Sequence, residues 1–161
     1  MIVLVYVCLV VSIVYNTYVI CHYNKVPESL SETAYLFGGN KRFLFTAYCM
    51  LVVFTLLPGL LSVTPENLQF LPTFIFFGLG MSGCSPMYRN KTDMDRLVHY
   101  LSAGYSFVAF VIYILTCLNH WWITGYLICL GGLYLWKKDC GVYFAEILAL
   151  VLIMANLILV L

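Results

Sequence analysis

The chain has 161 residues, of which 63% are hydrophobic and only 9% are charged, and its formal net charge is +1. Soluble domains carry about 25% charged residues, so this composition excludes a protein whose whole surface faces water. We expect lipid to be the main solvent and residues 1–161 to form a single transmembrane domain. The near-neutral charge, with no basic patch interleaved with aromatics, excludes nucleic acid as an expected partner.

Apolar stretches of about 20 residues, the length that crosses a bilayer, recur along the chain. We expect helices, because a backbone in lipid must satisfy its own hydrogen bonds and the alternation typical of membrane barrels is missing. The first stretch has no basic n-region or cleavage site and predicts a retained helix rather than a signal peptide. The predicted fold class is all-α, a bundle of about six transmembrane helices. They cover about residues 2–21, 43–63, 68–87, 97–118, 121–136 and 141–161.

The basic residues are distributed unevenly over the connections between these helices. All of them fall in the first, third and fifth connections, which the positive-inside rule places in the cytoplasm. Both termini are then expected outside the cytoplasm. The basic residues are Lys25, Lys41, Arg42, Arg89, Lys91, Arg96, Lys137 and Lys138.

The first connection carries a helix signal of its own. Ser29 is followed three residues later by Glu32, the spacing of a capping box, and Gly38-Gly39 can end a helix. The pattern predicts a short interfacial helix from about Leu30 to Phe37 on the cytoplasmic face, with an irregular loop as the alternative. The candidate residues for a cytoplasmic interaction surface are Ser29, Ser31, Glu32 and Tyr35.

Two ionisable residues, Glu146 and His99, fall within predicted spans at similar depth from the cytoplasmic side. Such residues are rare in lipid and usually face the protein interior. A Glu–His pair could couple to protons or bind a substrate. The alternatives are a structural hydrogen bond, or a glutamate whose head reaches back to the interface.

Other polar residues share this depth, among them Asn16 and Tyr100. The cytoplasmic third of every predicted helix is more polar than its outer half. One interpretation is a shallow polar cavity open to the cytoplasm, and the other is the ordinary enrichment of tyrosine and hydroxyl groups at an interface.

Motifs for catalysis and for metal binding are missing from the sequence. There is no Gly-rich phosphate loop, HExxH or GxSxG signature, and we expect no metal and no cofactor. The seven cysteines lack metal-site spacing and are expected to be small, buried, reduced hydrophobes.

Several short motifs carry a resemblance to known proteins. These are the run from Pro27 to Tyr35, Arg42-Phe43-Leu44-Phe45-Thr46, Ser85-Pro86, the run from His99 to Gly104, and Glu146. Together they resemble a group of small uncharacterised polytopic membrane proteins of Bacteroides-type bacteria and their mobile elements. The spacing of His99 and Ala103, with Phe107 after them, is also similar to the six-helix DRAM-like membrane proteins. The resemblance implies a six-helix fold in a bacterial inner membrane and no established activity.

Three functions follow as hypotheses. The leading one is a non-catalytic accessory, sensor or interaction protein that works through its cytoplasmic face, with a second copy or another membrane protein as partner. The second is a small transporter or oligomeric channel that uses the pair Glu146 and His99. The third is a membrane-embedded enzyme that modifies lipids.

Overall fold

The computed structural model describes residues 1–85, 93–118, 125–126, 129 and 138–161, and all regular structure within these residues is helical. Short 3-10 turns at Leu30–Glu32, Gly39–Arg42, Glu66–Leu68 and Lys138–Cys140 flank the α-helices. The α-helices are α1 (Ile2–Tyr23), α2 (Thr33–Phe37), α3 (Phe43–Val63), α4 (Phe70–Cys84), α5 (Asp93–Cys117) and α7 (Gly141–Val160).

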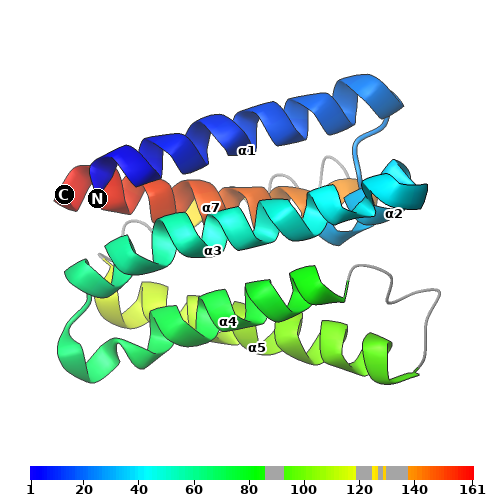
Figure 1. Cartoon of the computed structure of the whole chain (residues 1–161). Coiled ribbons are helices and arrows are strands. Elements are labelled where there is room, and N and C mark those ends of the chain that lie inside the picture. The colour runs from blue at the N-terminus through cyan, green and yellow to red at the C-terminus, as the bar shows by residue number, and fades with distance from the viewer. Residues whose placement is uncertain (86–92, 119–124, 127–128, 130–137) are drawn as a thin grey trace.

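The five longer helices run side by side (Figure 1). Helices α1 and α7 pack on each other and on α3, whereas α5 packs mainly on α4. Helix α3 joins the two groups because it also packs on α4. The two chain ends lie together at one end of the bundle, and α2 lies at the opposite end (Figure 1).

Four of the helices are long and apolar enough to cross a membrane: Ile2–Tyr23, Phe43–Val63, Met94–Cys117 and Gly141–Val160. They confirm four of the predicted apolar helices. Their outer faces expose large apolar side chains, such as Phe54, which is 72% exposed. Such surfaces are unfavourable in water and stable in lipid.

The other two predicted spans have different outcomes. Helix α4 has 15 residues, shorter than the predicted 68–87 and than the roughly 20 that a perpendicular span needs. It is shorter because a 3-10 turn at Glu66–Leu68 precedes it and its backbone leaves helical geometry at Ser85. The predicted helix at 121–136 lies almost wholly outside the described residues.

Small residues bring α4 and α5 close together. A Cβ atom added to Gly78 would lie 2.6 Å from the carbonyl oxygen of Ser102, so glycine is needed at this crossing. The hydroxyl of Ser106 donates to the carbonyl of Ile75 at 2.7 Å, and the hydroxyls of Ser82 and Ser102 are 2.9 Å apart. Small hydroxylated residues favour close helix packing of this kind in lipid.

The described basic side chains gather at the α2 end of the bundle. Lys25 follows α1, Lys41 and Arg42 precede α3, and Arg96 lies in the first turn of α5. The opposite end holds both termini and the connection around Glu66. The charge asymmetry of the sequence is therefore an asymmetry between the two ends of the fold.

Candidate functional site

A cavity of about 420 Å³ lies between the α4–α5 pair and α7. Helix α5 packs on α4, while α7 packs on α1 and α3, and the cavity lies between these two groups. The lining residues come from α3, α4, α5, α7, the Leu30–Glu32 turn and Tyr126. They are Leu30, Ser31, Phe45, Ile75, Phe76, Leu79, Ser82, His99, Ala103, Ser106, Phe107, Phe110, Tyr126, Val142, Ala145, Glu146, Ala149, Leu150 and Ile153.

The wall of this cavity is polar toward the α2 end and apolar further in. Glu146 lies five residues into α7 and His99 six residues into α5, so each is roughly 8 to 9 Å from the start of its helix. Ser31 and Ser82 line the same end. Phe110 and Ile153 line the deeper part, so the cavity is amphipathic along its length.

Glu146 is held in place by the first connection. Its Oε2 atom accepts a hydrogen bond from the backbone N–H of Leu30 at 2.7 Å. Leu30 begins a helical turn, and the first N–H groups of a helix have no partner within it. The carboxylate therefore satisfies a backbone donor while it also lines the cavity.

His99 lines the same cavity and is 5% exposed. Its ring lies against the backbone of Ser82 and Ser85 at the end of α4. The two ionisable residues singled out in the sequence are therefore brought to one cavity. Tyr100, the neighbour of His99, is 58% exposed and lies outside the cavity lining.

Asn16 belongs to a separate polar network between α1, α3 and α7. The hydroxyl of Tyr143 donates to Asn16 Oδ1 at 2.5 Å, and Asn16 Nδ2 donates to the carbonyl of Ser12 at 2.7 Å. The Tyr48 hydroxyl donates to Ser12 Oγ at 3.2 Å, and its ring stacks on that of Tyr15. The polar groups of this network hydrogen-bond to one another, so they hold the helices together.

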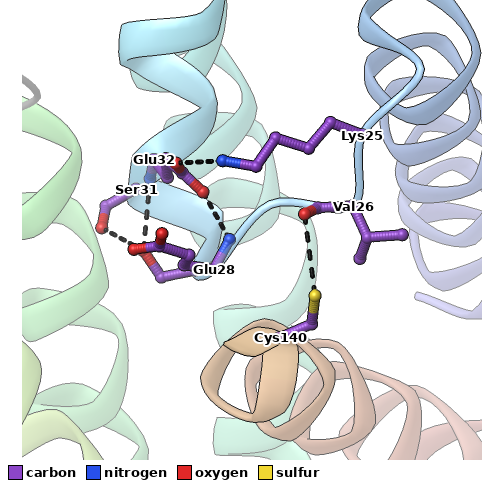
Figure 2. A network of polar contacts seen from close by, with 7 residues as sticks. Lys25, Val26, Glu28, Ser31, Glu32 and Cys140 are labelled. Atoms are coloured by element: carbon purple, nitrogen blue, oxygen red, sulfur yellow. Dashed lines mark hydrogen bonds and ion pairs between the residues drawn. The ribbon is translucent and has the colours of Figure 1, made fainter. Parts of the chain in front are cut away.

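The first connection folds around Glu32 (Figure 2). Ser29 Oγ accepts from the Glu32 N–H at 3.2 Å, which is one half of the predicted capping box. The Glu32 carboxylate bonds the N–H of Glu28 instead of that of Ser29. It also pairs with Lys25 Nζ at 3.0 Å, and this hydrogen bond raises the pKa of Lys25 above its ordinary 10.5.

Helical geometry covers the residues predicted for the short helix, as the Leu30–Glu32 turn and α2, but the segment packs into the bundle. Ser31 and Glu32 are buried, and Ser29 and Tyr35 are partly buried. The surface expected from these four residues is therefore largely turned inward. The reason is that the apolar residues between them join the core: Leu30, Ala34 and Phe37 are all buried.

Two further bonds fix this segment to the start of α7. The backbone N–H of Tyr143 donates to the carbonyl of Glu28 at 3.0 Å. The thiol of Cys140 contacts the carbonyl of Val26 at 3.7 Å (Figure 2). Together with the Glu146 bond, they make α7 and the first connection one packed unit.

Metal-binding side chains are dispersed in the described part of the chain. There, no three His, Cys, Asp or Glu side chains are close enough to hold a metal ion. The seven cysteines carry free thiols, but only Cys8 and Cys49 are buried. Their expected role as buried hydrophobes holds for those two.

Sequence reasoning missed the aromatic part of the cavity wall. Phe45, Phe76, Phe107, Phe110 and Tyr126 all line it. Aromatic residues such as Phe54 and Phe77 are also exposed on the outer faces of these helices, so composition alone does not single out those of the cavity wall. The Tyr126 hydroxyl is buried, and no described group hydrogen-bonds to it.

The chain matches no known protein family, and no curated protein or solved structure is significantly similar to it. Fold and site define the class at a coarse level: in its described part the chain is an all-helical bundle that has four helices able to cross a membrane and encloses an amphipathic cavity. The bacterial resemblance of its motifs stays a prediction.

Proposed function

We propose that this chain is a small, non-catalytic integral membrane sensor. It binds an amphipathic molecule in the cavity and transmits occupancy to the first connection, residues 24–42, on the cytoplasmic face. The observation that carries the proposal is the double role of Glu146, which lines the cavity and bonds the N–H of Leu30.

The size and wall of the cavity support ligand binding. Its volume of about 420 Å³ falls in the range of roughly 300–1,000 Å³ that small-molecule sites occupy. Such sites combine an apolar wall with a few placed polar groups, as here. A molecule with an apolar tail and a polar head matches this distribution.

The link to the first connection follows from competition for one carboxylate. A head group that reaches Glu146 changes the hydrogen bonding available to Leu30, the first residue of the packed helical segment. A ligand shifts an equilibrium only through differential contacts with two states, and loss of this bond on binding would supply such a difference. The segment lies at the basic end of the fold, where a cytoplasmic partner would meet it.

The test uses the full chain in nanodiscs of uncharged lipid and a set of twelve-carbon probes: dodecylamine, dodecanol and dodecyl sulfate. At least one probe should bind above empty nanodiscs and alter amide hydrogen exchange of residues Leu30–Phe37. Ala149→Trp fills the cavity and should remove both effects. Ala47→Trp, on an exposed face of α3, is the matched control and should keep them.

Two results overturn this proposal. One is that no probe binds above empty nanodiscs. The other is that Ala149→Trp and Ala47→Trp bind the probes equally well, because the molecules then occupy the outer surface.

A transporter is the second candidate, and the observation that favours it is the shared cavity of Glu146 and His99. It predicts flux of a bound probe into proteoliposomes that Glu146→Gln and His99→Ala both abolish. Binding without flux in the wild-type chain supports the sensor, and flux that ignores both substitutions removes the pair from any transport role.

A further inference from the structure

We infer that the molecule bound in this cavity is a single-chain amphiphile with a cationic ammonium head, which enters sideways from the bilayer and is held by Glu146. The inference rests on the proposed function and names its ligand class. It arises from three features of the cavity: an uncompensated carboxylate, an aromatic wall and a lining that reaches the outer surface of the bundle.

The carboxylate of Glu146 makes a single hydrogen bond with the described residues, to the N–H of Leu30. No described basic side chain forms an ion pair with it, and Lys25, the lysine of the first connection that forms an ion pair, is paired with Glu32. A carboxyl group away from water takes its charged form only where an opposite charge stabilises it. A cationic ligand would supply the missing charge where the cavity is most polar.

Aromatic rings surround the same space. Phe45 lies near the start of α3, close to the level of Glu146, whereas Phe107 and Phe110 lie further along α5 and line the part of the cavity that receives the tail. Aromatic faces attract ammonium groups, more strongly when water is excluded. The buried Tyr126 hydroxyl lines the cavity as well and offers an oxygen to an ammonium N–H.

The cavity lining reaches the outer surface of the bundle on α5 and α7. Three of its lining residues are on the outer surface: Ala103 is exposed, Phe107 is 52% exposed and Val142 is 60% exposed. Phe107 lies fourteen residues into α5, roughly 20 Å along a helix that can cross a membrane. At that depth this part of the lining faces lipid tails, so the ligand comes from within the bilayer.

The direction of the bound molecule follows from the wall. The head lies beside Glu146, and the tail runs past Ala149 toward Ile153. The lining part of α7 from Glu146 to Ile153 is roughly 10 Å long, which gives room for much of an alkyl chain beyond the head group. An anionic head would be repelled by the carboxylate, and a neutral one would leave it uncompensated.

The test measures binding of dodecylamine, which is cationic at pH 7, against dodecanol and dodecyl sulfate. Equilibrium dialysis uses the full chain in nanodiscs of uncharged lipid, with empty nanodiscs subtracted. Dodecylamine should bind most tightly, and Glu146→Gln should weaken it about tenfold or more. Binding of dodecanol by this variant should be unchanged, which shows that the cavity is intact.

Glu66→Gln is the matched control, since Glu66 is an exposed carboxylate at the opposite end of the fold, and it should leave dodecylamine binding as in the wild type. Tyr126→Phe should weaken dodecylamine selectively. Equal binding of dodecylamine by the wild type and Glu146→Gln overturns the inference, as does preference for dodecyl sulfate. Both results leave the sensor proposal standing, because some amphiphile still binds. If no probe binds, the sensor proposal and this inference fall together.

Discussion

The backbone N–H of Leu30 and the carboxylate of Glu146 are joined by a 2.7 Å hydrogen bond across 116 positions of the chain. Leu30 begins the helical segment of the first connection, and Glu146 is in the second turn of α7. This hydrogen bond lies where the cavity meets the α2 end of the fold. The first connection is therefore part of the wall of the site rather than a tether between helices.

Removal of this acceptor should destabilise the fold. Glu146→Ala leaves the Leu30 N–H without its partner, and we expect a loss of about 1–3 kcal/mol in the free energy of unfolding. Glu146→Gln keeps a carbonyl oxygen and should lose less. Unfolding in mixed micelles with increasing sodium dodecyl sulfate measures both. Equal stability of the Ala variant and the wild type would show that water or another acceptor takes the place of the carboxylate at the Leu30 N–H.

The long helices could be predicted from sequence because lipid imposes a simple rule on apolar runs of sufficient length. The Ser29 cap was also predictable, since it depends on residues three positions apart. The hydrogen-bond partner of Glu146 could not be predicted. It is a backbone group in a distant connection, and its approach depends on how Leu30 and Phe37 pack into the core.

The polar residues in the predicted cytoplasmic thirds of the helices show the same limit of prediction from sequence. Asn16 and Glu146 both fall in the polar third of a predicted helix, yet Asn16 bonds to Tyr143 and Glu146 lines a cavity. Depth in the helix is therefore similar for a residue in a hydrogen-bond network between helices and for one that lines a cavity. The two residues differ in the direction in which their side chains leave the helix axis. Packing between helices determines this direction, and a sequence whose helices are only weakly amphipathic does not reveal it.

Gly78 and Gly104 should respond oppositely to the same substitution. In Gly78→Ala the new methyl group would approach the carbonyl oxygen of Ser102 to 2.6 Å, so α4 and α5 must separate. We expect a loss of about 1–3 kcal/mol, typical of overpacking. Gly104 has open space around its Cβ position, and Gly104→Ala should stabilise the helix by up to about 1 kcal/mol.

Unfolding of both variants in the same micelles checks the pair. A stability loss at Gly104 as large as that at Gly78 would mean that both glycines lie at helix contacts, contrary to the described packing.

The pair of Lys25 and Glu32 should make stability depend on alkaline pH. The hydrogen bond raises the pKa of Lys25 in the folded state above 10.5. A group with a raised folded pKa stabilises the fold below its unfolded pKa and loses this contribution as pH rises through the folded value. Wild type should therefore melt at a higher temperature than Lys25→Met at pH 8, and the gap should close above pH 10.5.

This difference in melting temperature between the wild type and Lys25→Met should be small, because half of the Lys25 side chain is exposed and solvent screens its charge. Lys41→Met, at an exposed lysine of the same end, is the control and should show no such closing gap. A constant difference between Lys25→Met and the wild type across this pH range would assign the effect of the substitution to packing of the lysine stem.

The orientation inferred from the basic residues has a direct test, because the two ends of the fold must lie on opposite sides of the membrane. Glu66 and Lys41 are exposed at opposite ends of α3 and its flanking turns. In a chain whose cysteines are replaced by alanine or serine, Glu66→Cys should react with a membrane-impermeant maleimide in intact cells. Lys41→Cys should react only after permeabilisation, because the positive-inside rule places that end in the cytoplasm. The reverse labelling pattern would place the Glu146 end of the cavity outside the cytoplasm, and with it the segment through which the sensor is proposed to act.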